Sequence, residues 1–99
     1  MNIKISYDFS GKMWKYNGNG GWHFISIPKE YTKEIRENLQ WQEEGWGRMK
    51  ATASIENIEW NTAIWYDSKK NTYLLPIKSE IRRQAKLDIN KTYKVTIFL

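Results

Sequence analysis

Four basic residues near the C-terminus are the first candidates for chemistry in this chain. Lys78, Arg82 and Lys86 recur at every fourth position, with Arg83 beside them. On a helix this spacing places three cations on one face, where like charges repel one another and do not favour the helix. We predict that Lys78, Arg82, Arg83 and Lys86 bind an anionic ligand. The alternatives are neutralisation by carboxylates such as Glu59, Asp67 or Asp88, and an ordinary solvated face.

The six tryptophans are the second group of candidates. An exposed indole offers a flat ring on which bases or sugar rings stack. Because the chain has few large aliphatic residues, we expect most of these rings in the core: Trp14, Trp22, Trp60 and Trp65. Trp46 lies between two glycines and is the best candidate for an exposed ring. We predict a stacking or pocket site formed by Trp46, Arg48 and His23.

Acid–base and metal chemistry have weaker support. His23 is the single histidine, and no Asp or Glu lies at ligand spacing from it, so we expect a packed structural histidine. Four glutamates offer carboxylates for general acid–base work, but their context predicts solvation: Glu43, Glu44, Glu56 and Glu59. The glycine-rich segment 18–21 is not followed by Lys-Ser/Thr, as a phosphate-binding loop would be. We predict no catalytic residue, no metal and no cofactor.

Composition narrows the class of protein. The 99 residues suit one domain, 1–99, and the absence of cysteine excludes disulfides and thiolate chemistry. The formal net charge is +5, and residues 68–99 hold eight basic residues against two acidic ones. This basic segment is consistent with an anionic partner. The N-terminal residues lack a signal-peptide pattern, and the apolar runs are too short to span a bilayer, so we expect a cytoplasmic protein with no membrane partner.

The positions of apolar and turn residues predict mainly strands. Ile3, Ile5, Tyr7 and Phe9 alternate with polar residues, as in a half-buried strand. Gly11-Lys12 predicts a turn, after which segment 13–16 pairs back. A hairpin turn over 17–21 and a strand over 21–27 are expected next. Further strands are predicted over 47–55, 58–66, 72–75 and 93–98.

Two helices are predicted, one after each proline. Pro28 suits the first position of a helix of about three turns that buries Ile35 and Leu39. The second helix is expected over 79–87, with Ile81 and Ala85 facing inward. A strand ending in apolar-Pro and followed by a helix with Glu-Ile-Arg occurs twice, at 34–36 and 80–82. Two such halves would form one closed barrel with a pseudo-twofold axis, which hides strand edges.

We therefore predict a mainly β protein: a small closed or double-split β-barrel of six to eight strands with two short α-helices. Its most specific stretch is Tyr73-Leu74-Leu75-Pro76-Ile77-Lys78 with Ile81-Arg82. Together with Gly11…Trp14, Gly21-Trp22…Ile27-Pro28, Gly45-Trp46-Gly47 and Trp60…Ile64, this stretch resembles the prokaryotic family called domain of unknown function nineteen-oh-five. The resemblance runs nearly end to end. It implies a double-split β-barrel, the architecture of AbrB/MazE-type transition-state regulators, and no activity.

Three classes of function follow. The leading prediction is a non-catalytic binding or structural module whose ligand the sequence does not name. A nucleic-acid-binding regulator is the first alternative, supported by the basic C-terminal segment and by the resemblance in fold. Because such regulators generally act as dimers, this alternative requires a homodimer. A small-molecule-binding domain or enzyme accessory domain is the other. An enzyme has the least support, because no nucleophile, metal set or cofactor motif is recognisable, and a pocket with His23, Thr62 or Arg82 at its base would favour that class.

Overall fold

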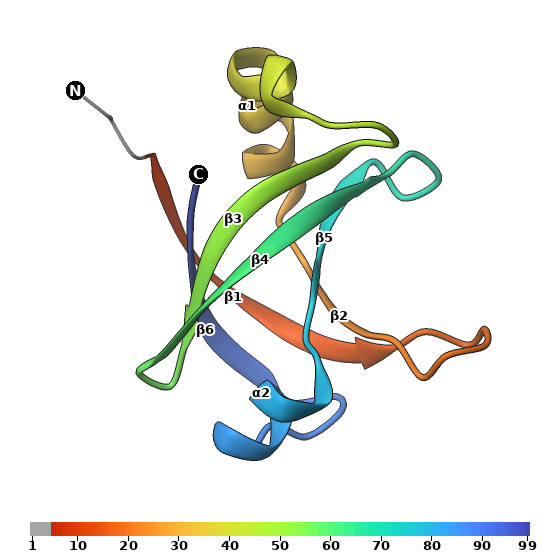
Figure 1. Ribbon diagram of the computed structural model, residues 1–99, viewed down its shortest axis with the longest axis vertical. Helices are drawn as coiled ribbons and strands as arrows, with labels where there is room; N and C mark the ends of the chain where they lie inside the picture. Colours follow the sequence, from red (N-terminus) through yellow and green to blue (C-terminus); the bar gives the residue numbers. More distant parts are fainter. Residues whose placement is uncertain (1–4) are drawn as a thin grey trace.

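In the computed structural model, which describes residues 5–99, six antiparallel strands close into a barrel with a helix at each end (Figure 1). Along the chain the elements are β1 (Ser6–Lys15), β2 (His23–Ser26), α1 (Lys29–Leu39), the 3-10 turn η1 (Gln40–Gln42), β3 (Arg48–Ile55), β4 (Ile58–Asp67), β5 (Thr72–Pro76), α2 (Ser79–Gln84) and β6 (Thr92–Phe98). The mainly β fold, the closed barrel and the two short helices are confirmed. The predicted strand position Ile3 lies outside the described residues.

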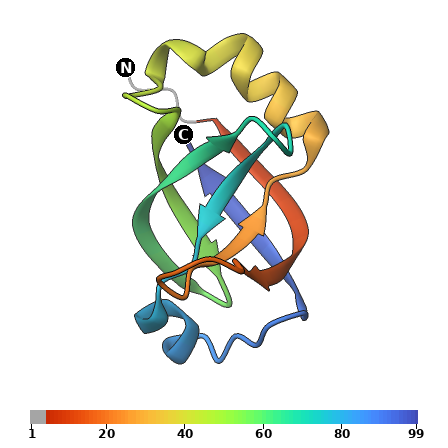
Figure 2. The ribbon, with the colours of Figure 1, turned by 90° about the vertical axis from the view of Figure 1, so that its right-hand side faces the viewer.

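The order of strands around the barrel has the symmetry expected of two related halves. Each half runs strand, strand, helix, strand: β1-β2-α1-β3 and then β4-β5-α2-β6. The ring order is β1-β2-β5-β4-β3-β6, and exchanging the two halves leaves this order unchanged. The helices lie at opposite ends of the barrel (Figure 2). Ile35 of α1 and Ile81 of α2 are both buried, so the repeated Glu-Ile-Arg segment has the same packing role twice.

Strand β1 runs straight through the position where a turn was predicted. It pairs with β6 from Ser6 to Lys12 and with β2 from Met13 to Lys15, and Gly11 lies opposite Tyr93. The predicted turn at Gly11-Lys12 is therefore wrong. A Cβ atom at Gly11 would collide with the side chain of Ile25. The glycine instead allows β1 to approach β2 closely as it crosses from one partner strand to the other.

Helix α1 covers one end of the barrel. Pro28 is its N-cap and precedes the first helical residue, one position away from its predicted place. Ile35 and Leu39 are buried, as predicted. Thr32 joins the helix to the barrel, because its hydroxyl oxygen accepts a hydrogen bond of 3.2 Å from the N–H of Tyr73 in β5. No helix within residues 5–99 is long and apolar enough to cross a membrane.

Helix α2 is shorter than predicted, and its end changes the position of one predicted site residue. The helix ends at Gln84, and Lys86 adopts a left-handed conformation with φ 55°. The N–H of Leu87 donates to the carbonyl of Arg82 and that of Lys86 to the carbonyl of Arg83, which is a Schellman motif. Lys86 therefore lies past the helix, and the predicted row Lys78, Arg82, Lys86 does not share one helical face.

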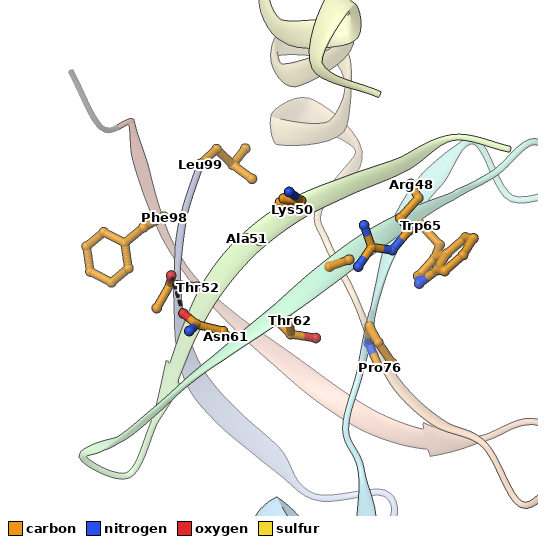
Figure 3. A pocket seen from close by; sticks show the side chains of 11 residues that line it. Arg48, Lys50, Ala51, Thr52, Asn61, Thr62, Trp65, Pro76, Phe98 and Leu99 are labelled. Atoms are coloured by element: carbon orange, nitrogen blue, oxygen red, sulfur yellow. Dashed lines mark hydrogen bonds between the residues drawn. The ribbon is translucent and has the colours of Figure 1, made fainter. Parts of the chain in front are cut away.

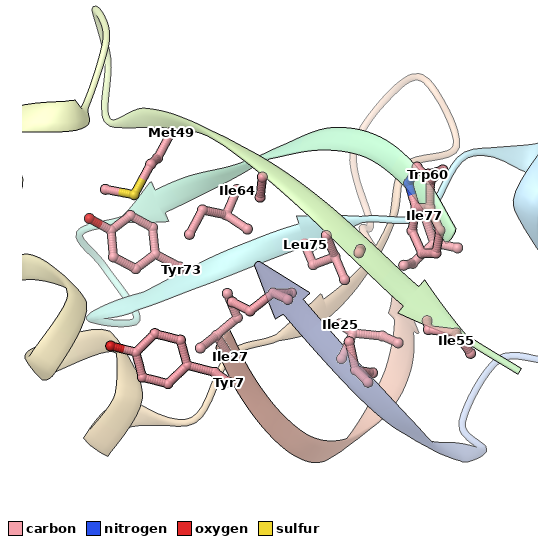
Figure 4. Close-up of a cluster of buried hydrophobic side chains, with 14 of the residues drawn as sticks. Tyr7, Ile25, Ile27, Met49, Ile55, Trp60, Ile64, Tyr73, Leu75 and Ile77 are labelled. Carbon is pink, nitrogen blue, oxygen red and sulfur yellow. The ribbon is translucent and has the colours of Figure 1, made fainter. Parts of the chain in front are cut away.

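The interior of the barrel is filled mainly by aliphatic side chains (Figure 4). The largest fully buried side chains come from every strand, from α1 and from the residues that directly follow β2 and β5: Tyr73, Met13, Ile25, Ile27, Ile35, Met49, Ile55, Ile64, Leu75, Ile77, Ile97 and Val95. Among the tryptophans of the described chain, Trp60 alone belongs to this cluster. The expectation that most indoles form the core is wrong, because smaller side chains already fill the interior of this six-stranded barrel.

Candidate functional site

Aromatic and other apolar side chains project outward, in register, from four consecutive strands of the barrel. Trp14 of β1 lies opposite Phe24 of β2, which lies opposite Pro76 of β5. One step along, Leu74 of β5 lies opposite Trp65 of β4. Side chains of directly opposed residues point to the same face of a sheet. The result is a continuous apolar strip on the outside of the barrel, across β1, β2, β5 and β4.

This strip forms the floor of an open groove with a volume of about 620 Å³, which we call the aromatic groove. Five rings line it: Trp14, Tyr16, Trp22, Phe24 and Trp65. Trp22 is 54% exposed and Trp65 39% exposed. Large apolar surfaces of this kind are uncommon on soluble domains and generally mark a binding site.

The rings of the aromatic groove hold defined orientations. Trp22 and Phe24 are stacked, with centroids 6.0 Å apart and planes 6° apart. The Trp14 ring packs against Phe24 at 5.2 Å, and its Nε1–H donates a 3.0 Å hydrogen bond to Ser26 Oγ. The Nζ of Lys70 lies 3.7 Å from the centroid of the Trp14 ring. This cation–π contact places a positive charge directly over the apolar floor.

Two further hollows adjoin the aromatic groove. The β3–β4 hollow, of about 670 Å³, contains Arg48 and Lys50 and shares Trp65 with the groove (Figure 3). The β4–β5 hollow, of about 460 Å³, contains Lys78 and Arg82 and shares Trp22 with the groove. Thr62 and Pro76 line both hollows, which therefore also meet each other. We call the three together the basic aromatic face.

Charge on the basic aromatic face is almost entirely positive. Its basic residues are Lys15, Arg48, Lys50, Lys70, Lys78 and Arg82, and its one acidic residue is Asp67. A carboxylate oxygen of Asp67 already accepts the backbone N–H of Lys69 at 2.9 Å. Six cations and one anion give this face +5, which equals the formal net charge of the whole chain. A surface of this sign concentrates anions near it.

His23 holds Arg82 in place at the edge of the β4–β5 hollow. Nε2 of the buried imidazole lies 3.2 Å from Nη1 of Arg82, and Nδ1 lies 2.7 Å from the carbonyl oxygen of Gly21. A guanidinium only donates, so Nε2 accepts and Nδ1–H donates to Gly21. Arg82 Nε also donates to the carbonyl of Ile77 at 3.2 Å. Within residues 5–99, no three His, Asp or Glu side chains gather closely enough to hold a metal ion.

A comparison with known families places the chain in one of them. The family model described as Domain of unknown function (DUF1905) matches residues 9–97. The chain belongs to the DUF1905 family. No curated protein matches it. The family predicted from the Tyr73–Arg82 stretch and the spaced glycines and tryptophans is thereby confirmed.

The structure of this DUF1905 protein separates the four basic residues of the predicted row. Lys78 and Arg82 line the β4–β5 hollow. Arg83 lies at a shallow depression beside Glu80, and Lys86 lies beyond the helix end. Asp88, one of the carboxylates considered for the row, is paired with Lys91 at 3.2 Å instead. Binding of an anion at Lys78 and Arg82 stays a prediction.

The predicted stacking site is also separated. Trp46 is 92% exposed in the turn before β3, but it does not line the aromatic groove. Arg48 lines the β3–β4 hollow, where its guanidinium lies 5.9 Å from the centroid of the Trp65 ring. His23 belongs to the β4–β5 hollow. The structure therefore does not bring Trp46, Arg48 and His23 together.

Several residues of the basic aromatic face were missed by sequence reasoning. Trp14, Trp22 and Trp65 were assigned to the core, and Lys50 and Lys70 were not considered. A signal was present in β4, where Trp65 follows the apolar Ile64 directly. In a strand these neighbours point to opposite faces. If Ile64 is inside the barrel, Trp65 must be outside it.

At the end of the barrel that α1 covers, a polar cluster is fully paired. Glu43 accepts a hydrogen bond from Nη1 of Arg36 at 2.9 Å and another from the hydroxyl of Tyr73. The Arg36 guanidinium also lies 3.8 Å from the centroid of the Tyr66 ring. Burial, with the hydrogen bond to Glu43, holds the pKa of Tyr73 well above its usual value. The expectation that Glu43 is solvated is wrong, because this carboxylate fixes η1 to the barrel.

Proposed function

We propose that this protein is a non-catalytic binding module and that its ligand presents flat rings to the aromatic groove. The observation that carries this proposal is the position of Trp14, Trp22 and Trp65 outside a barrel whose interior is already filled. These three indoles do not contribute to the core and lie together in one groove, which favours a role in ligand binding.

The groove is also suited to binding without rearrangement. Trp14 is fixed by its hydrogen bond to Ser26 and by its contact with Phe24, and Trp22 is stacked on Phe24. A ligand that stacks on rings already ordered avoids part of the entropic cost of binding. His23 is likewise held in place, by Arg82 at 3.2 Å and by the carbonyl oxygen of Gly21 at 2.7 Å.

The cellular location and the domain organisation that we propose are those predicted from the sequence. A chain without cysteine suits a reducing compartment, and we place the protein in the bacterial cytoplasm. We take residues 1–99 as one domain.

The indole N–H signals test the proposal directly. The chain has six tryptophans, so an NMR spectrum of protein labelled at the indole nitrogens gives one signal for each. Adenosine, a neutral compound with a flat ring, should shift the signals of Trp14, Trp22 and Trp65 as its concentration rises. Trp41 and Trp46, which are 79% and 92% exposed but outside the groove, are internal controls. Assignment follows from single Trp→Phe variants.

Two results would count against this function. Equal shifts of Trp41, Trp46 and the groove indoles would show that adenosine stacks on any exposed indole. No shift at millimolar adenosine would show that the groove does not bind rings. D-Ribose, which lacks the base, serves as the matched ligand control and should shift none of the groove signals.

A further inference from the structure

We propose that the basic aromatic face binds single-stranded nucleic acid, with bases stacked in the aromatic groove and phosphates held by cations of the two adjoining hollows. This inference rests on the proposed function and names the ligand class. It assigns separate roles to the rings and to the charges of one continuous surface.

The rings are placed where successive bases need them. Trp65 lies at the boundary between the aromatic groove and the β3–β4 hollow, and Trp22 lies at the boundary with the β4–β5 hollow. Trp14 and Phe24 lie within the groove, and Phe24 contacts both Trp14 and Trp22. A strand that crosses the groove meets an aromatic ring along its whole path. Stacking on such platforms tolerates any base, because every base has a π-face.

The charges lie where the backbone of that strand would run. Arg48 and Lys50 occupy one adjoining hollow, Lys78 and Arg82 the other, and Lys70 covers the groove itself at Trp14. Of the six cations on the face, Arg48 alone forms an ion pair within residues 5–99, with Glu44 at 3.2 Å. The other five have no carboxylate within ion-pair distance in that part of the chain, and phosphates would supply the opposite charge.

Other ligands use only part of this surface. A neutral sugar would stack on the rings and leave the cations unused, and an acidic polypeptide would use the cations and leave the indoles exposed. A duplex hides the faces of its bases within its own stack, so the groove rings do not reach them. A single strand alone presents accessible base faces and a phosphate in each repeat. The combination of rings and unneutralised cations therefore favours single strands.

Fluorescence anisotropy provides the test. The probe is a fluorescein-labelled oligo(dT) of about fifteen nucleotides, within the range of site sizes of small single-strand-binding domains. At low salt it should bind with saturation, and unlabelled oligo(dT) should displace it. A duplex of the same length and a polyglutamate of similar charge should each compete at least about tenfold less well.

Tryptophan variants inside and outside the aromatic groove test where oligo(dT) binds. Trp22→Ala and Trp65→Ala should each weaken oligo(dT) binding by at least about fivefold, the lower limit for loss of one stacked base. Trp41→Ala and Trp46→Ala remove indoles that are more exposed but lie outside the groove, and should leave the affinity unchanged. Melting curves confirm that each variant is folded. Trp65→Phe, which keeps a ring, should recover most of the loss.

The outcomes separate this inference from the proposed function. Shifts of the groove indoles by adenosine without oligo(dT) binding at low salt would overturn the nucleic-acid ligand and leave a ring-binding module. Equal competition by the duplex or by polyglutamate would overturn the single-strand assignment, as would equal losses from Trp46→Ala and Trp65→Ala. Failure of both adenosine and oligo(dT) to act on the groove would overturn both proposals.

Discussion

The two Glu-Ile-Arg segments place one arginine at each end of the barrel, and the two arginines differ in their partners. Arg36 of α1 donates to the carboxylate of Glu43 at 2.9 Å and covers the Tyr66 ring. Arg82 of α2 contacts a neutral imidazole, His23, and the carbonyl of Ile77. The charge of Arg36 is neutralised within the fold by a carboxylate. Arg82 is fixed in position, but no carboxylate among residues 5–99 neutralises its charge.

This difference makes the Arg36 end a structural end, whereas Arg82 lines the face that is proposed to bind a ligand. At the Arg36 end, the charges of Arg36 and Glu43 are paired with each other. This pair needs no ligand, and it fixes α1 and η1 to the barrel. The Arg82 end adjoins the groove, where rings and cations are exposed together. The repeated sequence segment thus has the same buried apolar residue in both copies, while the partners of its arginine differ between them.

The two buried isoleucines should prove equivalent. Ile35→Ala and Ile81→Ala each delete a side chain that is at most 4% exposed, and each should lower the free energy of unfolding by about 3 kcal/mol. Urea denaturation measures both. A cost below about 1 kcal/mol for one of them would show that the two helices do not pack alike.

The two arginines should differ in their contribution to stability. Arg36→Met leaves the Glu43 carboxylate, 13% exposed, without its cation, and should cost about 2 kcal/mol, less than a fully buried pair because Arg36 is 28% exposed. Arg82→Met loses hydrogen bonds to a carbonyl and an imidazole and should cost about 1 kcal/mol. Urea denaturation compares them. A larger cost at Arg82 would contradict the assignment of the structural end.

The Arg36 end should also respond to alkaline pH. Because the pKa of Tyr73 is raised in the folded state, the unfolded chain releases that proton near pH 10 while the folded chain retains it. The unfolding free energy should therefore fall as the pH rises above 10. Tyr7, whose pKa burial also raises, adds to the fall.

Melting temperatures between pH 9 and pH 12 measure this effect. The melting temperature of Tyr73→Phe should fall less steeply with pH than that of the wild type. The melting temperature of Tyr16→Phe, which changes a tyrosine that is 50% exposed, should fall as steeply as that of the wild type. A Tyr73→Phe curve parallel to the wild type would show that this hydroxyl does not control alkaline stability.

The smallest effect concerns the end of α2. Lys86 has φ 55° at the position where Schellman motifs favour glycine, so Lys86→Gly should raise the free energy of unfolding by about 0.5 kcal/mol. Because Lys86 lies outside the basic aromatic face, its loss should not change oligo(dT) affinity. A clear loss of affinity would instead support the predicted row of four cations.

Much of the fold was predictable because its signals are local. The prolines Pro28 and Pro76, the alternation in β6 and the repeated Glu-Ile-Arg segment predicted the strands, the helices and a closed barrel. Gly11 was misinterpreted, because a glycine that permits close contact between strands has the same local signature as a glycine in a turn. Only the neighbour, Ile25 on another strand, distinguishes the two cases.

The site was harder to predict because it depends on which strands meet. Trp14, Phe24, Trp65 and Leu74 come from four strands, and their grouping follows from the ring order and the register. Lys78 and Arg82 were selected for a helical spacing, and both lie on the basic aromatic face. Trp46 was selected for its exposure, which is correct, but exposure alone does not place a ring beside others.

The salt dependence of oligo(dT) binding shows whether the unpaired cations and the exposed rings of the basic aromatic face act together. Single strands release about 0.7 counterion per neutralised phosphate, so four to six contacts predict a slope of log K against log salt of about −3 to −4. The double variant Lys50→Gln/Lys78→Gln should reduce the slope by about 1.4, and Lys33→Gln on α1 should leave it unchanged. A slope near zero, or one that Lys33→Gln changes as much as the double variant does, would contradict the account.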